Sequence, residues 1–123
     1  MPVLFKPRKD EDVYVVWSSL LGSEPLSASL SAAQVVDEVE RGVSVLTDSV
    51  SEARSMLECA DVYGCGEIEV EQWDKAQVVY NESGETFIIA HCEMGVFADR
   101  YFEDEDVDAS DLLAGEDADI FRE

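Results

Sequence analysis

The sequence predicts an α+β fold, in which a small antiparallel sheet has two helices packed on one face and an acidic segment follows at the C-terminus. Short β-branched and aromatic runs indicate strands, and two stretches near the middle of the chain repeat apolar residues at helical spacing. The resulting order, β-α-α-β-β-β, groups the helices instead of alternating them with strands. Grouped helices are typical of α+β folds, in which they cover one face of an antiparallel sheet.

Composition divides the chain into three parts. Residues 1–11 are predicted to form an N-terminal arm, because Pro2 and Pro7 interrupt regular structure there. Residues 12–101 have the length and the apolar content of a single domain. Residues 102–123 form an acidic C-terminal segment, with ten acidic residues against one arginine. We therefore expect one folded unit with two flanking segments.

The first half of the predicted domain contains a strand and a capped helix. Residues 13–17 are all β-branched or aromatic, which indicates a central strand. A serine-rich loop over residues 18–30 follows. Ser31 and Gln34 have the spacing of a capping box, and Gly42 suits the left-handed position after a helix end. We therefore predict a helix between Ser31 and Gly42.

A second helix is predicted between residues 49 and 64. Ser49 and Glu52 repeat the capping-box spacing, and Gly64 marks the end of the helix. The apolar residues of this stretch recur every three or four positions, which places them on one stripe of a helix. They are Val50, Ala53, Met56, Leu57 and Ala60.

Further strands are predicted after the helices. Residues 67–71 alternate between glutamate and apolar residues, so Ile68 and Val70 are expected to face the core. Residues 76–80 and 86–92 are mostly apolar, and a short polar loop that contains a glycine joins them. These two strands are therefore expected to form a hairpin.

The acid excess is the strongest functional signal in the chain. There are 29 acidic residues against 8 basic ones, which gives a formal net charge of -21. The excess extends over the predicted domain as well as the C-terminal segment, although residues 1–9 are net basic. A surface of this charge repels nucleic acids and anionic membranes, so we expect neither direct nucleic-acid binding nor membrane binding. It favours a basic protein as the partner, which we expect to be a nucleic-acid-binding protein.

Residues 67–71 carry the most regular group of acidic side chains. On one face of a strand, Glu67, Glu69 and Glu71 would stand ~6.7 Å apart, about two nucleotide steps of a duplex. The row is interpreted either as part of a carboxylate array for lysine and arginine clusters or as a solvated face that protects a sheet edge. The acidic run after residue 102 either extends this array or is a solvated tail. The candidate partner-binding residues are Glu67, Glu69, Glu71, Glu103, Asp104, Glu105, Asp106, Asp108 and Asp111.

The histidine and the cysteines do not form a recognisable site. His91 is predicted to be a packed or edge residue of a strand, because the sequence assigns it no nucleophile and no orienting group. Cys59 and Cys65 are separated by five residues, which is wider than the usual spacing of zinc ligands. Cys92 should face away from its neighbour His91, as adjacent residues of a strand do. Buried thiols are therefore expected instead of a zinc site.

Motifs for metal binding, phosphate binding and nucleophilic catalysis are incomplete. Residues 104–108 match the opening of a calcium-binding EF-hand loop, but Ala109 replaces the required glycine and Gly115 replaces the bidentate glutamate. Residues 64–66 lack the lysine and the length of a phosphate-binding loop. An enzyme with paired carboxylates and a metal lacks the ligand spacing. We therefore predict a non-enzymatic protein without a metal or cofactor.

In size, acidity and lack of catalytic residues, the chain resembles the nucleic-acid-mimic inhibitors encoded by phages, a likeness that transfers no residue. It implies a binding protein whose carboxylates stand in for phosphates and block a host defence protein that binds nucleic acid. The alternative is a small structural or assembly component, for example of a virus particle, from a halophilic source, whose acidity is an adaptation to salt. No signal peptide is evident, so a cytoplasmic location is expected, in the host if the protein is virus-encoded.

Overall fold

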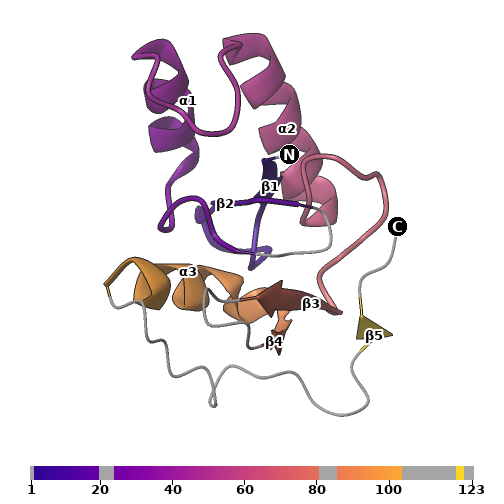
Figure 1. Ribbon diagram of the computed structural model, residues 1–123. Coiled ribbons are helices and arrows are strands. Elements are labelled where there is room, and N and C mark those ends of the chain that lie inside the picture. The colour runs from indigo at the N-terminus through magenta and orange to yellow at the C-terminus, as the bar shows by residue number, and fades with distance from the viewer. Residues whose placement is uncertain (1, 20–23, 81–85, 104–118, 121–123) are drawn as a thin grey trace.

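The computed structural model shows an α+β fold arranged in three layers (Figure 1). The structure describes residues 2–19, 24–80, 86–103 and 119–120. Its elements are β1 (Val3–Phe5), β2 (Val15–Trp17), α1 (Ala32–Glu40), α2 (Val50–Tyr63), β3 (Lys75–Tyr80), β4 (Thr86–Ala90), the 3₁₀ helix η1 (His91–Glu93), α3 (Met94–Glu103) and β5 (Asp119–Ile120). In Figure 1, α1 and α2 form the upper layer, β1 and β2 lie beneath them, and α3 lies at the bottom with β3 and β4.

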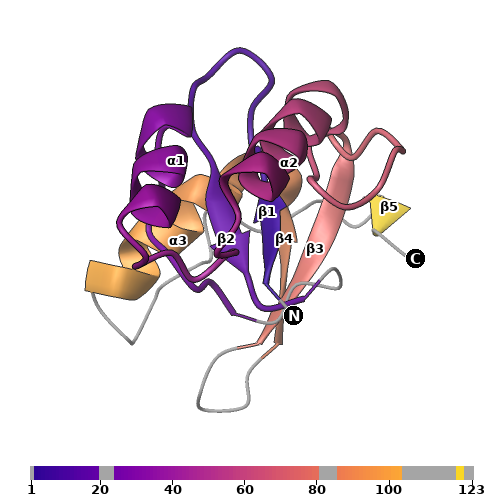
Figure 2. The same cartoon turned by 90° about the horizontal axis from the view of Figure 1, so that it is seen from above.

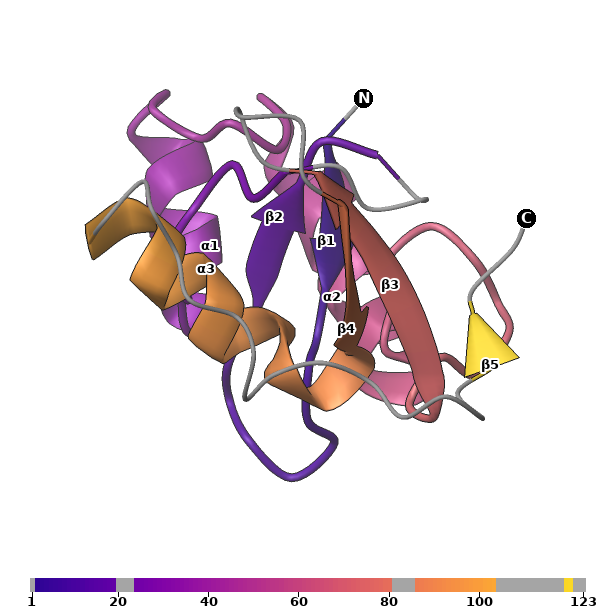
Figure 3. The same cartoon turned by 60° about the horizontal axis from the view of Figure 1, so that its bottom comes forward.

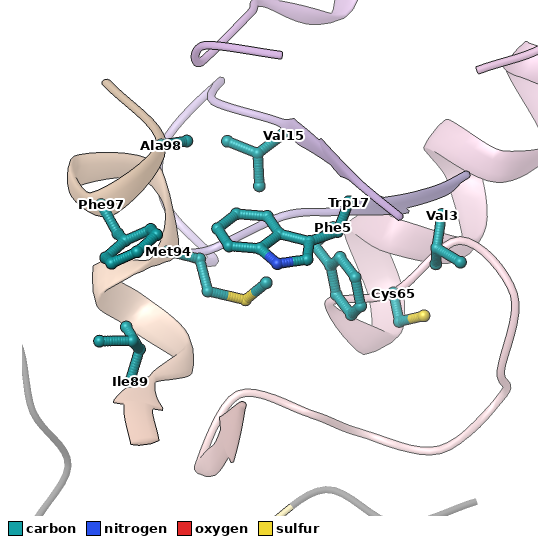
Figure 4. Packing of buried hydrophobic residues seen from close by; sticks show 9 residues of the cluster. All are labelled: Val3, Phe5, Val15, Trp17, Cys65, Ile89, Met94, Phe97 and Ala98. Carbon is teal, nitrogen blue, oxygen red and sulfur yellow. The ribbon is translucent and has the colours of Figure 1, made fainter. Parts of the chain in front are cut away.

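The sheet of β1 and β2 is the centre of the fold, and both of its faces are covered. The two strands are antiparallel, with Val3 opposite Trp17, and alternate residues point to opposite faces. One face belongs to a core that Figure 4 shows in close view, made up of Val3, Phe5, Val15, Trp17, Cys65, Ile89, Met94, Phe97 and Ala98. The other face belongs to a core beneath α1 and α2, made up of Leu4, Tyr14, Val16, Val35, Leu46, Leu57 and Ala60. The central strand predicted for residues 13–17 is confirmed, and it spans Val15–Trp17.

Both predicted helices are confirmed, with caps at the predicted residues. Ser31 caps α1, because its hydroxyl accepts a hydrogen bond from the Gln34 N–H while the Gln34 side chain accepts one from the Ser31 N–H. Ser49 caps α2 by accepting from the Glu52 N–H at 3.3 Å, and Gly64 follows the helix with a φ of 85°. Seen from above, α1 and α2 cover one face of β1 and β2 (Figure 2). No helix in the described ranges is long and apolar enough to cross a bilayer.

The second half of the chain forms the predicted hairpin and a helix that the sequence analysis missed. β3 and β4 pair in antiparallel register, and β5 pairs with β3 in parallel. The strand predicted for residues 86–92 ends at Ala90, because His91 begins η1 and α3 follows. Met94 and Phe97 have helical spacing, and both are buried in the core that Figure 4 shows. Packing of these side chains therefore favours a helix over a continued strand. Figure 3 shows α3 and the β3–β4 hairpin on the same side of the β1–β2 sheet.

Two short segments differ from their predictions. The arm predicted for residues 1–11 is not irregular throughout: Val3–Phe5 forms β1 and is fully buried, because pairing with β2 outweighs the flanking prolines. The strand predicted for residues 67–71 is wrong, because the backbone there turns back to the end of α2 instead of pairing with a strand. Val70, which was expected in the core, is 58% exposed. Most of the acidic segment, residues 102–123, lies outside the described residues.

Candidate acidic interface

An open groove of about 570 Å³ lies between α2 and the segment that follows it. Carboxylates, hydroxyls and sulfur atoms surround this groove, which is lined by Ser51, Glu52, Ser55, Met56, Cys59, Gly66, Glu67 and Glu69. We call these residues the acidic groove. Ser51, Ser55 and Cys59 are spaced four positions apart along α2, so they share one stripe of the helix. Two segments of the chain therefore build one site.

The segment of residues 66–72 begins close to the middle of α2. A Cβ atom added to Gly66 would lie 3.1 Å from the Cβ atom of Met56, which is closer than ordinary contact. Glycine therefore lets the two backbones approach at this point. Farther along the segment, the Cys59 sulfur lies 3.8 Å from the Ile68 carbonyl oxygen. The segment thus starts one wall of the groove beside the helix.

The other end of this segment is fastened to the end of α2. The Gln72 N–H donates to the Tyr63 carbonyl at 2.7 Å. The Gln72 side chain is buried, and its amide Nε2 donates to the Val70 carbonyl at 2.6 Å. These bonds return the chain along α2 from its middle to its last turn. The glutamates between the two ends are therefore held beside the helix.

The negative charges of the groove act on the Cys59 thiol. Partial burial raises the pKa of Cys59, and the charges of Glu69 and Glu67 raise it further. A thiolate is disfavoured beside negative charge, so this effect reflects the proximity of both carboxylates. Both glutamates are exposed, as is Glu52, whose side chain accepts a hydrogen bond from the Thr47 hydroxyl at 2.8 Å. The groove is therefore negatively charged and open to solvent.

Two of the predicted partner-binding residues line the groove. They are Glu67 and Glu69; Glu71 is exposed on the same segment but does not line the groove. Glu103 is exposed at the end of α3, which lies across the molecule from residues 66–72 (Figure 1 and Figure 2). The remaining predicted residues lie outside the described residues: Asp104, Glu105, Asp106, Asp108 and Asp111. Among the described members of the predicted array, only Glu67 and Glu69 are thus brought together at the groove.

The helical wall of the groove was not predicted from the sequence. The sequence placed Ser51, Glu52 and Ser55 only within the helix predicted between residues 49 and 64, with Glu52 at the capping-box position. Their positions relative to Cys59 form a recognisable stripe at helical spacing. This stripe becomes part of a site only because the following segment returns along it.

Asp61, another carboxylate of α2, has different surroundings. The Lys6 ammonium donates to Asp61 at 2.9 Å, and the Tyr14 hydroxyl donates to the same oxygen. Partial burial alone would raise the pKa of Asp61, but the hydrogen bonds from Tyr14 and Lys6 outweigh burial and lower that pKa. Burial and the adjacent Asp61 raise the pKa of Tyr14. Asp61 is thus a carboxylate whose charge is offset within the fold.

His91, in η1, contacts the backbone of Lys6. Its side chain is 1% exposed, and its Nε2 lies 2.7 Å from the Lys6 carbonyl oxygen. The rings of Phe5 and Trp73 meet the imidazole edge-on, with centroid distances of 6.1 and 6.0 Å. Burial lowers the pKa of His91 to about 4. The prediction of a packed histidine is confirmed, although its place in a strand was wrong. We call the set Lys6, Tyr14, Asp61 and His91 the Lys6 cluster.

Neither metal-ligand geometry nor similarity assigns a function to the groove. Within the described ranges, no three His, Cys, Asp or Glu residues are grouped as metal ligands. Comparisons of the chain with protein-family models, curated protein sequences and solved structures give no match. The groove itself and the charge of the chain are therefore the features that bear on function.

Proposed function

We propose that this protein is a non-enzymatic binding protein that presents carboxylates to a basic partner. The acidic groove is the observation that supports the proposal most directly, because Glu52, Glu67 and Glu69 line it and are exposed. The formal net charge of -21 attracts a cationic partner and speeds its encounter with the protein. Lysine or arginine side chains of that partner bind in the groove.

More specifically, we propose that the partner is a nucleic-acid-binding protein. The carboxylates of this protein then occupy the partner's nucleic-acid-binding site in place of phosphates. The regular row expected from a strand at residues 67–71 does not support this more specific proposal, because that segment is not a strand. Its support is the overall charge and the convergence of glutamates from two segments. Displacement of a labelled DNA duplex from restriction or CRISPR effector proteins tests it, because a mimic competes with the duplex.

Adaptation to concentrated salt is the competing explanation of the same charge, with the protein as a structural or assembly component. The two explanations differ in the salt that folding requires. Thermal unfolding followed by circular dichroism in ~0.1 M and ~1 M salt compares screening lengths of ~10 Å and ~3 Å. A cooperative transition in dilute buffer is expected for the binding protein. Folding only in molar salt would favour the adaptation.

Binding of a fluorescent oligoarginine peptide tests the groove directly. Wild-type protein is compared with a Glu67→Gln/Glu69→Gln variant and with an Asp10→Asn/Glu40→Gln variant, which removes equal charge from exposed positions outside the groove. We expect several-fold weaker binding and a smaller salt dependence for the groove variant alone. Equal losses in the two variants would mean that net charge, rather than the groove, attracts the peptide. A wild-type protein that does not bind would contradict the proposal.

A further inference from the structure

Two exposed valines lie near the end of α2 that adjoins the acidic groove. Val62 on α2 is 55% exposed, and Val70 on the following segment is 58% exposed. Val62 lies three positions after Cys59 and seven after Ser55, so it extends the helical stripe that forms one wall of the groove. The stripe therefore changes from polar to apolar toward the end of the helix.

The backbone contacts of residues 66–72 bring Val70 to the same end of α2. On one side of Val70, the Ile68 carbonyl lies 3.8 Å from the Cys59 thiol of the helix. On the other side, the Gln72 N–H is bonded to the carbonyl of the last α2 residue at 2.7 Å. Val70 is thus held beside the last turn of α2, which carries Val62. Exposed apolar side chains adjoining a polar rim are typical of interaction surfaces.

We infer that the acidic groove and the Val62–Val70 pair together form a docking surface for a basic amphipathic helix of the partner, an inference that rests on the proposed function. Apolar residues of such a helix, spaced three or four positions apart, pack on the two valines. Its lysines or arginines extend their aliphatic stems over Met56 and place their charged ends near Glu67 and Glu69.

Charge complementarity selects this occupant over a second copy of the chain. Each copy carries a formal net charge of -21, so two copies repel one another at ordinary ionic strength. A cationic helix is attracted by the same field. The valines then supply a contribution that salt does not screen, because burial of apolar surface is not an electrostatic effect. Binding should therefore have a salt-sensitive and a salt-resistant part.

Two fluorescent peptides distinguish the salt-sensitive from the salt-resistant contribution to binding. One is an amphipathic lysine/leucine helix of about four turns, and the other is an oligolysine of equal charge. A Val62→Ser/Val70→Ser variant is compared with a Val43→Ser/Val45→Ser control, whose valines are 58% and 50% exposed in the connection before α2. We expect the first variant to bind the amphipathic helix about tenfold more weakly at both low and high salt. Its affinity for oligolysine, and both affinities of the control, should be unchanged.

The outcomes distinguish this inference from the proposed function. If oligolysine binds as tightly as the amphipathic helix, or if the Val62→Ser/Val70→Ser variant binds that helix like the wild type, the inference is wrong and the proposed function stands. If neither peptide binds the wild type, both fail. Self-association of the wild type in molar salt that the same variant loses would assign the patch to a second copy and overturn the inference. Circular dichroism spectra of the variants verify that they are folded.

Discussion

Two groups of residues along α2 contain carboxylates, and the surroundings of these carboxylates differ. In the Lys6 cluster, Asp61 accepts hydrogen bonds from a buried lysine and from a tyrosine hydroxyl. In the acidic groove, Glu67 and Glu69 are exposed beside a thiol whose pKa they raise. Among the described residues, no basic side chain forms an ion pair with either glutamate. The first group neutralises its charge within the fold, and the second leaves it accessible to a partner.

This difference separates charge that stabilises the fold from charge that is available for binding. The lowered pKa of Asp61 means that its ionised form favours the folded state. Burial and then the charges of Glu69 and Glu67 raise the pKa of Cys59, in keeping with carboxylates that no described basic side chain pairs with. Residues that do not contribute to the stability of the fold, such as carboxylates without a compensating charge, are typical of functional sites.

The largest expected effect is the pH dependence that His91 gives the Lys6 cluster. The unfolded chain binds a proton at the ordinary pKa of 6.5, whereas the buried imidazole binds one only at about 4. This residue therefore leaves the free energy of unfolding unchanged above pH 6.5 and lowers it by roughly 3 kcal/mol as the pH falls to about 4. Urea unfolding at a series of pH values measures the change. A His91→Phe variant should lack this part of the pH dependence, and equal slopes in both proteins would contradict the prediction.

The next effect concerns the ion pair of the Lys6 cluster. A Lys6→Met variant keeps an aliphatic stem but leaves Asp61, whose side chain is 50% exposed, without its cation, so we expect the free energy of unfolding to fall by about 1 kcal/mol. Arg41→Met is the matched control, because Arg41 pairs with Asp37 at 2.8 Å but its side chain is 61% exposed, against 11% for Lys6. The control should lose less than about 0.5 kcal/mol. Urea unfolding at pH 7 compares them, and similar losses would mean that burial does not distinguish the two pairs.

Local signals predicted the two helices because capping acts over a few residues. Ser31 bonds to Gln34 within one turn, and Gly64 follows α2 at a positive φ that glycine adopts readily. β1 was missed because a strand of only three residues, flanked by prolines on both sides, has no periodic pattern, and pairing with β2 decides its conformation. α3 did leave a signal, since Met94 and Phe97 have helical spacing. The apolar strand before them hid the boundary between the two elements.

The candidate site was predictable only in part, because it forms between two segments. The acidity of residues 67–71 pointed to Glu67 and Glu69, but alternation with apolar residues indicated a strand that the fold does not contain. Alternation predicts a strand only where another strand is available for pairing. Here the Gln72 N–H bonds to the Tyr63 carbonyl, a contact that no local pattern encodes.

The smallest expected effect isolates the negative potential of the acidic groove. Neutralising Glu67 and Glu69 as glutamines should lower the pKa of Cys59, because their charges raise it in the wild type. In a Cys92→Ser background, which removes the exposed thiol, alkylation by iodoacetamide at pH 8 should become faster, since the thiolate is the nucleophile. The free energy of unfolding should change by less than about 0.5 kcal/mol, as for other exposed substitutions.

The same alkylation measurement separates the potential of the groove from the net charge of the chain. An Asp10→Asn/Glu40→Gln variant in the same background removes equal charge from exposed positions that do not line the groove, and it should leave the rate unchanged. In molar salt, the screening length shortens to ~3 Å, which should reduce the difference in alkylation rate between the groove variant and its parent. An unchanged rate in the groove variant would mean that Glu67 and Glu69 do not act on Cys59 in solution. Because that action distinguishes the groove from the Lys6 cluster, the contrast between Asp61 and the two groove glutamates would then lose its electrostatic basis.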